Sequence, residues 1–246
     1  VAPTLGAISG PSECVRVNTG ISLNASFSDP GLLDTHTAIW EWGDGTTSAG
    51  LVTETDGSGS VSGSHAYAKA GIYTVKLTVT DKDADSAVAS WEYVIVYDPK
   101  GGCLVSLGRF TSPPGSIPGS VLSGPVPFSF NCGYSSKSGK PTGLAVFSFP
   151  GRNLGWAVRS FDWMVVSGSV AYCRGTCQIN GKAGYSFLVA AQDGRLNAQD
   201  RQNRIRVRIW NTATGAVIYD TQPGASMDAP PTLPLNCGIG LICICR

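Results

Sequence analysis

Two tryptophans two residues apart, followed at once by a glycine-flanked aspartate, are the feature that most constrains how this chain folds. The stretch reads Ile39-Trp40-Glu41-Trp42-Gly43-Asp44-Gly45. On an extended strand, Trp40 and Trp42 point to one face and Glu41 points to the other. Two indoles on one face present too much apolar surface to leave in water. We therefore expect that face to belong to a hydrophobic core.

The glycines that flank Asp44 predict a tight turn directly after this strand. Glycine adopts positive φ at little cost, and an aspartate carboxylate accepts hydrogen bonds from nearby backbone N–H groups. We therefore expect Trp42, Gly43, Asp44 and Gly45 to have a structural role, as a turn that ends the strand.

A second cluster completes a pattern of four motifs in order. Ser64-His65-Ala66-Tyr67 precedes residues 72–80, which alternate apolar and polar side chains as a half-buried antiparallel strand does. With the Trp-Gly-Asp-Gly turn, the closing Val-Thr-Asp and the approach Phe27-Ser28-Asp29-Pro30-Gly31, these segments resemble the PKD (polycystic kidney disease) domain family. The resemblance covers about residues 1–97. It implies an immunoglobulin-like β-sandwich that serves as an extracellular spacer or interaction module.

The rest of the chain, residues 99–246, is expected to form a second β unit after a sandwich of residues 1–98. Short apolar runs alternate there with turn signals such as Asn180-Gly181, which is the spacing of a second sandwich or roll. Much of this half resembles an uncharacterised β-rich module at the C-termini of secreted bacterial proteins that contain PKD-type repeats. That resemblance implies export and surface association, and it implies no activity. The fold class predicted for the whole chain is all-β.

Charge and hydropathy exclude several classes of partner. The net charge is +1, so no electrostatic feature favours nucleic acid or an anionic membrane surface. No run of about 20 apolar residues exists, so no span of a bilayer is expected. The chain opens at Val1 without an initiator methionine or an apolar leader. We interpret it as a processed segment of a secreted, extracellular or cell-surface protein.

The eight cysteines predict disulfides in an oxidising compartment, because no Cys-x-x-Cys zinc pair exists. They are Cys14, Cys103, Cys132, Cys173, Cys177, Cys237, Cys243 and Cys245. Only Cys14 lies in the first domain, and seven is an odd number, so Cys14 is expected to bond to the tail of its own chain or of another. Cys173 and Cys177 are expected to close a small hairpin or to reach the tail. The sequence leaves the connectivity open.

No set of residues predicts a catalytic site. Ser64, His65 and Asp44 lack any sign of an oxyanion hole, so a hydrolytic triad is not supported. The carboxylates available for a glycosidase pair also lack a recognisable catalytic context; they are Asp29, Asp34, Glu41, Asp162 and Asp193. The sequence therefore predicts a protein that is not an enzyme and that requires no cofactor.

Calcium is the one cofactor that the acidic loops favour. Hard cations bind several oxygen ligands, which converging loops at one end of a sandwich supply. Some PKD-like modules bind calcium through their entry and closing loops, and the matching positions here are Asp29, Asp34, Asp81 and Asp83, with Asp85 as an outer candidate. The alternative is a set of solvated turn carboxylates.

Two further groups of residues are candidates for binding. Arg204, Arg206 and Arg208 alternate along one strand, as a solvated face or as a basic ladder for an acidic partner or a polysaccharide. Trp156 and Trp210 are either core residues or exposed rings that stack on sugars.

The function predicted first is structural: a self-assembling or adhesive cell-surface protein or filament subunit, whose partners are copies of itself or other surface proteins. An exposed edge strand would allow one sheet to add to another. The alternative is an accessory carbohydrate-binding or spacer module of a secreted polymer-degrading enzyme.

Overall fold

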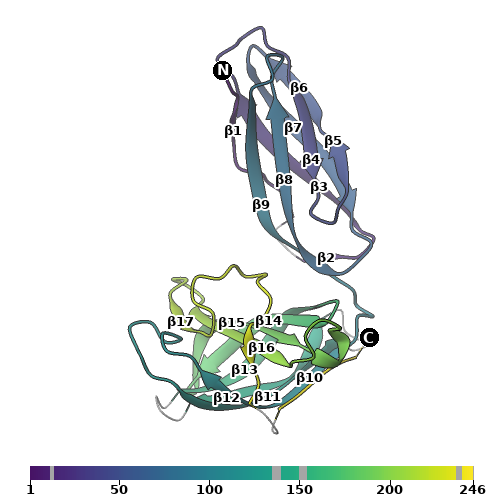
Figure 1. Cartoon of the computed structure of the whole chain (residues 1–246). Helices are drawn as coiled ribbons and strands as arrows, with labels where there is room; N and C mark the ends of the chain where they lie inside the picture. The colour runs from purple at the N-terminus through teal and green to yellow at the C-terminus, as the bar shows by residue number, and fades with distance from the viewer. Residues whose placement is uncertain (12–13, 135–139, 150–153, 237–239, 246) are drawn as a thin grey trace. The chain divides into compact units, whose positions relative to one another are not determined.

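The computed structural model describes residues 1–11, 14–134, 140–149, 154–236 and 240–245 (Figure 1). The chain forms two compact units, Val1–Val96 and Tyr97–Arg246, so the boundary lies two residues before the residue 98 expected from the sequence. Regular structure among the described residues is β-strand, apart from the short 3-10 helix η2 (Gly194–Leu196). The predicted all-β fold class is confirmed.

Two antiparallel sheets pack face to face in the N-terminal unit. Their strand orders are β1-β3-β7-β6 and β2-β9-β8-β4-β5. The strands are β1 (Thr4–Leu5), β2 (Val15–Arg16), β3 (Gly20–Ser28), β4 (Thr37–Glu41), β5 (Thr47–Ala49), β6 (Leu51–Thr55), β7 (Ser58–Ala66), β8 (Gly71–Thr80) and β9 (Ser86–Tyr97). This is the immunoglobulin-like sandwich that the resemblance implied.

The two tryptophans lie in the core between these sheets. Trp40 and Trp42 are 0% and 1% exposed, and their rings stack with centroids 5.6 Å apart. Strand β3 contributes the facing surface, because its burial alternates strictly along Gly20–Ser28. The expectation that one face of the tryptophan strand is core is therefore confirmed.

A two-residue turn sets the register of the neighbouring hairpin. Thr55 of β6 pairs with Ser58 of β7, so Asp56 and Gly57 alone make the turn. Both have positive φ, 49° and 71°, which is the type I′ geometry that matches the twist of antiparallel strands. Glycine suits the second position because it adopts positive φ without steric cost.

The C-terminal unit is built on one ten-stranded antiparallel sheet. The path of neighbours is β17-β16-β15-β14-β13-β12-β11-β10-β19, and β18 pairs with β16. The strands are β10 (Cys103–Ser112), β11 (Gly124–Tyr134), β12 (Pro141–Phe149), β13 (Leu154–Ser167), β14 (Val170–Ile179), β15 (Lys182–Gln192), β16 (Arg204–Asn211), β17 (Val217–Asp220), β18 (Leu233–Pro234) and β19 (Gly240–Cys245).

This sheet curls until β17, at one end, meets β10, the second strand from the other end. The Tyr219 hydroxyl of β17 donates a hydrogen bond to Ser112 Oγ of β10 over 3.0 Å. The inner face encloses one apolar core that is rich in phenylalanine. Of the two forms expected for this half, a sandwich or a roll, the structure has the roll.

Side chains occupy the outer edge of the last strand, β19. Asp193 Oδ2 accepts from the Ile244 N–H over 3.1 Å, and Asn203 Nδ2 donates to the Gly240 carbonyl over 3.3 Å. Arg195 Nη2 donates to the carbonyl between them, that of Ile242, over 3.4 Å. These groups take the place of a neighbouring strand, so the expectation of an exposed edge is wrong for β19.

Asp193 holds this edge, and its loss is expected to destabilise the roll. The Asp193 side chain is fully buried and also forms a two-point pair with Arg195, over 3.0 and 2.7 Å. Asp193→Ala leaves the Ile244 N–H without its acceptor, and we expect the free energy of unfolding to fall by about 3 kcal/mol in urea titrations. The matched variant Asp200→Ala removes a partly exposed pair with Arg204 and should cost less than about 1 kcal/mol. Equal losses in the two variants would contradict this role of Asp193.

Candidate metal centre

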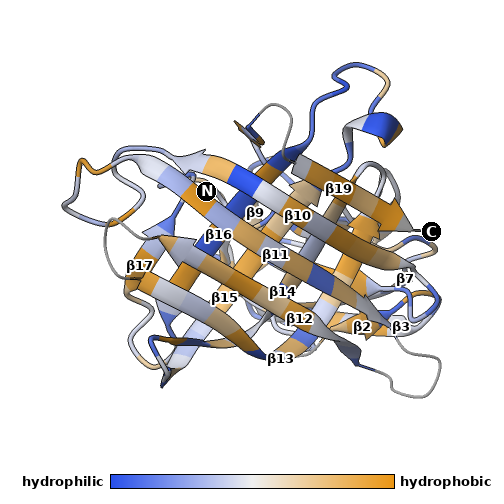
Figure 2. Cartoon of the chain, turned by 90° about the horizontal axis from the view of Figure 1, so that it is seen from below, coloured by the Kyte–Doolittle hydropathy of each residue, from blue (hydrophilic) through white to orange (hydrophobic). Residues whose placement is uncertain are grey.

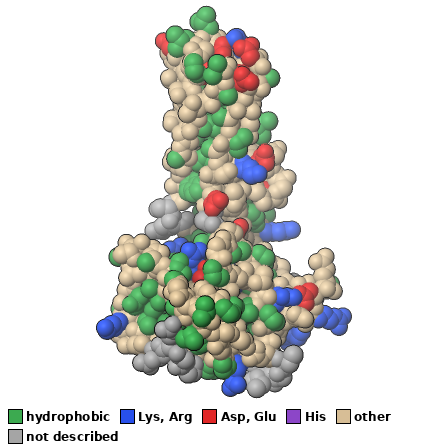
Figure 3. All heavy atoms as spheres, turned by 60° about the vertical axis from the view of Figure 1, so that its left-hand side comes forward, with side chains coloured by type: hydrophobic (Ala, Val, Ile, Leu, Met, Phe, Trp, Pro, Cys, Tyr) green, Lys and Arg blue, Asp and Glu red, His purple; other side chains and the backbone are tan. Residues whose placement is uncertain are grey.

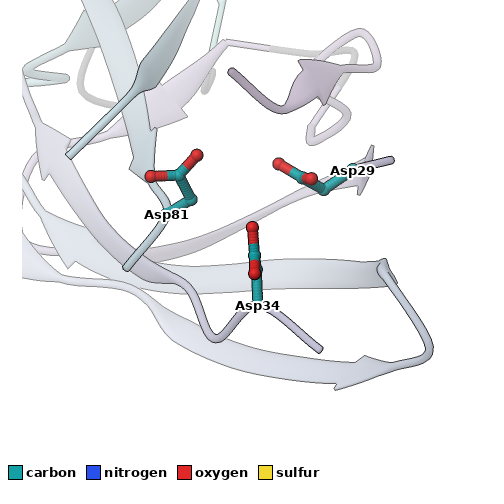
Figure 4. Close-up of side chains that lie close together, drawn as sticks. All are labelled: Asp29, Asp34 and Asp81. Carbon is teal, nitrogen blue, oxygen red and sulfur yellow. The ribbon is translucent and has the colours of Figure 1, made fainter. Parts of the chain in front are cut away.

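Three aspartates come together at one end of the N-terminal sandwich. Asp29 directly follows β3, Asp34 lies shortly before β4, and Asp81 directly follows β8. One carboxylate oxygen of each lies within 4.8 Å of the others. Figure 4 shows the three carboxylates turned toward a common space, and acidic side chains gather at this end of the unit in Figure 3.

Two of these carboxylates are fixed by their own loops. Asp29 Oδ1 accepts from the Gly31 N–H over 2.6 Å, and Asp81 Oδ1 accepts from the N–H groups of Asp83 and Asp85, both over 2.9 Å. Such short-range bonds are typical of aspartates that shape turns. The second oxygen of Asp81, Oδ2, is buried and has no hydrogen-bond partner among the described residues. A buried carboxylate oxygen without a partner is energetically costly.

His36 is buried beside this cluster and joins it to a neighbouring strand. Its Nε2 lies 3.3 Å from Asp29 Oδ2, and its Nδ1 lies 2.7 Å from Glu54 Oε2 of β6. Burial alone would lower the pKa of His36, but the bonds to Glu54 and Asp29 outweigh it and raise that pKa. The pKa of Asp29 is lowered, chiefly by the Gly31 N–H and also by His36.

His36 and Glu54 were not predicted from the sequence as residues of this site. A signal for His36 was present, because it is in phase with the buried residues Ala38 and Trp40 of the following strand. A histidine at an inward position needs polar partners inside the protein. Nothing local pointed to Glu54, which meets His36 only because the two sheets of the sandwich pack against each other.

A lysine holds the third aspartate. Lys82 Nζ lies 2.5 Å from Asp34 Oδ1 and 3.4 Å from Asp83 Oδ2. The Asp83 carboxylate is 64% exposed and does not join the other three. Of the four predicted calcium ligands, the structure therefore brings three together and leaves the Asp83 carboxylate outside. Asp83 contacts the three clustered aspartates through its backbone N–H, which donates to Asp81.

The donor atoms in this cluster fit a hard cation. The three carboxylates supply oxygen ligands, and Asp81 Oδ2 has no hydrogen-bond partner in the part of the chain that the structure describes. Both ring nitrogens of His36 are engaged by carboxylates. The donor set is therefore all oxygen, which suits calcium or magnesium better than zinc.

Asp44 and His65 lie together at the tryptophan turn and hold it. Asp44 Oδ1 accepts from the Thr46 N–H over 3.0 Å, and Asp44 Oδ2 lies 2.8 Å from His65 Nε2. Hydrogen bonds from Thr46 and His65 outweigh burial and lower the pKa of Asp44. Gly43 has φ +80°, and a Cβ there would lie 2.4 Å from the Thr74 carbonyl oxygen. Turn geometry explains each of these contacts.

The arginine ladder binds a loop of its own chain. Arg206 is fully buried, and its guanidinium donates to the carbonyls of Ser226 and, over 3.1 Å, Ala225. Arg204 Nη1 donates to the Thr232 carbonyl over 2.7 Å. The expectations of a solvated face or an open receptor for an acidic partner are wrong for Arg206, because a segment that follows the strand covers it.

The two candidate sugar-stacking tryptophans are both engaged by neighbours. Trp156 is 2% exposed and packs edge-on against Phe147, with ring centroids 4.6 Å apart. The prediction of an exposed ring is therefore wrong for Trp156, and the core alternative holds. Trp210 is half-buried, and the guanidiniums of Arg174 and Arg208 lie 5.5 and 5.9 Å from its ring centroid.

The predicted disulfide cysteines fall in different surroundings. Cys103 is disulfide-bonded and stands opposite Cys245 in the β10–β19 register. Cys173 and Cys177 lie four residues apart on the one strand β14, which separates them by about 13 Å at ~3.3 Å per residue. They therefore do not close a hairpin with each other. Cys237 lies outside the described residues, and the expected link from Cys14 to the tail stays a prediction.

The buried His36 makes a pH-dependent contribution to stability. Its pKa in the folded protein is raised above the ordinary value of 6.5, so its contribution is complete below pH 6.5 and is lost as pH rises through the folded-state pKa. We expect the free energy of unfolding to fall over that window in wild type and to fall less in His36→Asn. Urea titrations at several pH values measure both slopes, and identical slopes would contradict this assignment.

Comparison with known proteins identifies the first unit. Residues 1–95 match the PKD domain family, as the motifs predicted. Among solved structures, the cycloalternan-forming enzyme from Listeria monocytogenes in complex with a pentasaccharide substrate is similar at 6% identity and a TM-score of 0.27, over 86% of this chain and 18% of that one. No curated protein matches the chain.

Among the residues described, no helix has the length and hydrophobicity needed to cross a bilayer.

The match over the first unit agrees with its two-sheet sandwich and with its Trp-Gly-Asp-Gly turn. Residues 1–95 of this chain are therefore a PKD domain, a member of a family of non-catalytic modules typical of extracellular proteins.

Proposed function

We propose that this chain is a non-catalytic structural protein of the extracellular space that assembles with copies of itself. The observation that carries this proposal is an exposed apolar surface on the C-terminal roll. Its five large residues are each between 43% and 69% exposed. They are Val105 and Leu107 of β10, Leu144 and Val146 of β12, and Leu241 of β19.

Strand pairing makes this surface, here called the outer apolar face, continuous. Leu241 lies directly opposite Leu107, and Leu107 lies opposite Ser129, whose other neighbour is Val146. Val105 and Leu144 form a parallel row on either side of Asn131. The four strands β19, β10, β11 and β12 thus lie side by side (Figure 2) with two apolar rows across them.

A second copy of the chain is the partner that suits the outer apolar face. Its two rows contain apolar residues, Ser129, Asn131 and Cys243, and no charged residue. A contact related by two-fold symmetry would set this face against itself and bury apolar side chains on both sides. The net charge of +1 places little repulsion between copies.

The polar groups that catalysis would need support a non-catalytic role. Asp44 and His65 are engaged at a turn, and Asp193 is engaged at the edge of β19. Each of these groups already has a structural partner that would have to be given up for chemistry. The match of the first unit to a non-catalytic family agrees with this reading.

Charge on the outer apolar face is expected to block assembly. Wild-type protein should associate as its concentration rises, measured by sedimentation velocity, and should form fibres or layers in electron micrographs. Leu107→Lys or Leu144→Lys sets like charges against each other, and we expect the concentration for half-association to rise at least about tenfold. The matched control Leu51→Lys, at a 70% exposed site of the PKD domain, should assemble as wild type does. A wild type that stays monomeric at high concentration would refute the proposal.

The alternative role, an accessory carbohydrate-binding module, has less support from the side chains. Trp156 is in the core, and guanidiniums lie over Trp210. Polysaccharide pull-down by a protein that does not associate with itself would favour that alternative.

We also propose that Asp29, Asp34 and Asp81 bind calcium. Asp81 Oδ2, which has no hydrogen-bond partner among the described residues, supports this proposal, because a bound cation would balance its negative charge. Lys82 supplies part of that charge at Asp34, and its side chain is 49% exposed, so it is free to swing into solvent. Calcium would tie the loop after β3 to the loop after β8 and stiffen that end of the sandwich.

Calcium binding is expected to raise the melting temperature of the protein and to be reported by Tb³⁺ luminescence. At a free calcium concentration of 100 times Kd, the stabilisation is about 2.7 kcal/mol. Asp81→Asn keeps an oxygen for the N–H groups of its turn but removes the charge, and we expect the affinity to fall at least about tenfold. Lys82→Gln removes the competing ammonium and should tighten binding by roughly two- to fivefold.

Asp83→Asn is the matched control for the calcium site, because its carboxylate lies outside the cluster. It should retain most of the wild-type affinity. An unchanged melting temperature of the wild type in millimolar calcium would rule the site out.

A further inference from the structure

Two buried cysteines face each other across the interior of the C-terminal roll. Cys132 of β11 and Cys173 of β14 are 2% and 0% exposed within the same apolar core. Each is a thiol in the structure, and burial, together with a Cys132 side chain close enough to interact, raises the pKa of the Cys173 thiol. We propose that Cys132 and Cys173 form a disulfide bond that links opposite walls of the roll.

Contacts of the residues on both sides of Cys132 hold β11 against β13 and β15, the strands that lie opposite it in the roll. Two residues before it, the Phe130 ring lies against Phe187 of β15, with centroids 6.3 Å apart. Two residues after it, the Tyr134 hydroxyl donates to the Met164 carbonyl over 3.1 Å and accepts from the Met164 N–H over 3.2 Å. Inward positions of β11 on either side of Cys132 therefore both reach the far wall.

Strand register places Cys173 between the same two contacts on that wall. Cys173 pairs directly with Met164 of β13. Gly175, two residues further along β14, pairs with Phe187 of β15. Cys132 therefore lies between two positions of β11 that contact β15 and β13, and Cys173 lies on β14, the strand between those two.

Cys177 does not compete for this partner. It lies four residues beyond Cys173 on β14, about 13 Å away at ~3.3 Å per residue. A disulfide requires Cα atoms within about 7 Å of each other, so one cysteine on β11 cannot reach both positions. Cys177 is instead beside the Trp156 indole.

The chemistry of the bond is a two-electron oxidation. The S–H bonds of Cys132 and Cys173 and the S–S bond of an exchange partner, a glutathione or protein disulfide, break, and one S–S bond forms between the two cysteines. The two electrons and two protons that the cysteines lose convert that partner to two thiols. Because both sulfurs are buried in the finished roll, exchange must take place before β11 and β14 close over each other. The oxidising compartment is the one point at which this inference rests on the proposed extracellular role.

The bond would join strands that do not hydrogen-bond to each other. In the sheet order, β12 and β13 separate β11 from β14. A link across the interior therefore restrains the curl of the sheet, which neighbouring ladders do not restrain directly. We expect its loss to lower the melting temperature of the roll by on the order of 10 °C.

Peptide mapping is the first test. The whole chain is refolded from denaturant in a reduced and oxidised glutathione buffer, its remaining thiols are alkylated, and it is digested without reductant. We expect a linked peptide pair that contains Cys132 and Cys173 and that disappears on reduction. The Cys103 disulfide reports that the conditions were oxidising. Full alkylation of Cys132 and Cys173 in a sample whose Cys103 is oxidised would overturn the proposal.

Thiol counts in variants provide a second test. In denaturant without reductant, Cys132→Ala frees Cys173 and should raise the number of reactive thiols by one relative to wild type. Cys173→Ala should do the same by freeing Cys132. The matched control Cys177→Ala should lower the count by one. A fall by one in all three variants would overturn the proposal. Assembly and calcium binding of the wild type are measured in separate experiments, so their outcomes do not depend on this one.

Discussion

The stacked indoles of Trp40 and Trp42 are the interaction on which the N-terminal sandwich depends. The two rings fill the space between its sheets, and the His65 ring continues the stack 4.9 Å from Trp42. Asp44 binds His65 from the turn, and the Tyr67 hydroxyl donates to the Trp42 carbonyl over 2.9 Å. Apolar burial and turn hydrogen bonds therefore support each other at one point, and this consistency between local and tertiary preferences favours a single rigid fold.

Buried charge has a structural role in both units. In the PKD domain, His36 joins Asp29 to Glu54 and so connects a loop to a strand. In the roll, Asp193 satisfies a backbone edge, and Arg206 holds a covering segment by its carbonyls. A buried ionic group is costly unless its bonds are satisfied, so each of these groups specifies the position of a loop. Two such groups are incompletely satisfied among the described residues: Arg206 Nε, and one carboxylate oxygen of Asp81 at the candidate metal centre.

Three proposals assign different tasks to different surfaces of the chain. Calcium would stiffen the acidic end of the PKD domain, the outer apolar face would join copies of the roll, and an interior disulfide would restrain the curl of the sheet. The tasks are physically compatible, because they use separate groups of residues. The edge of β19 fits this view: its backbone groups are already satisfied, so association is left to side chains on the face of the sheet.

The sequence by itself determined the local structure of this protein. Period-two alternation identified the strand over residues 72–80, turn chemistry identified the bend at Asp44, and the order of motifs identified the PKD domain, because these signals depend on residues close together in the chain. Three of the four calcium candidates also came together, since the loops that carry them meet at one end of the sandwich. Only the tertiary structure decided that Arg206 is buried under a later segment and that Cys132 faces Cys173. Those outcomes depend on how far the sheet curls and on which distant strands then meet, and no local pattern encodes that.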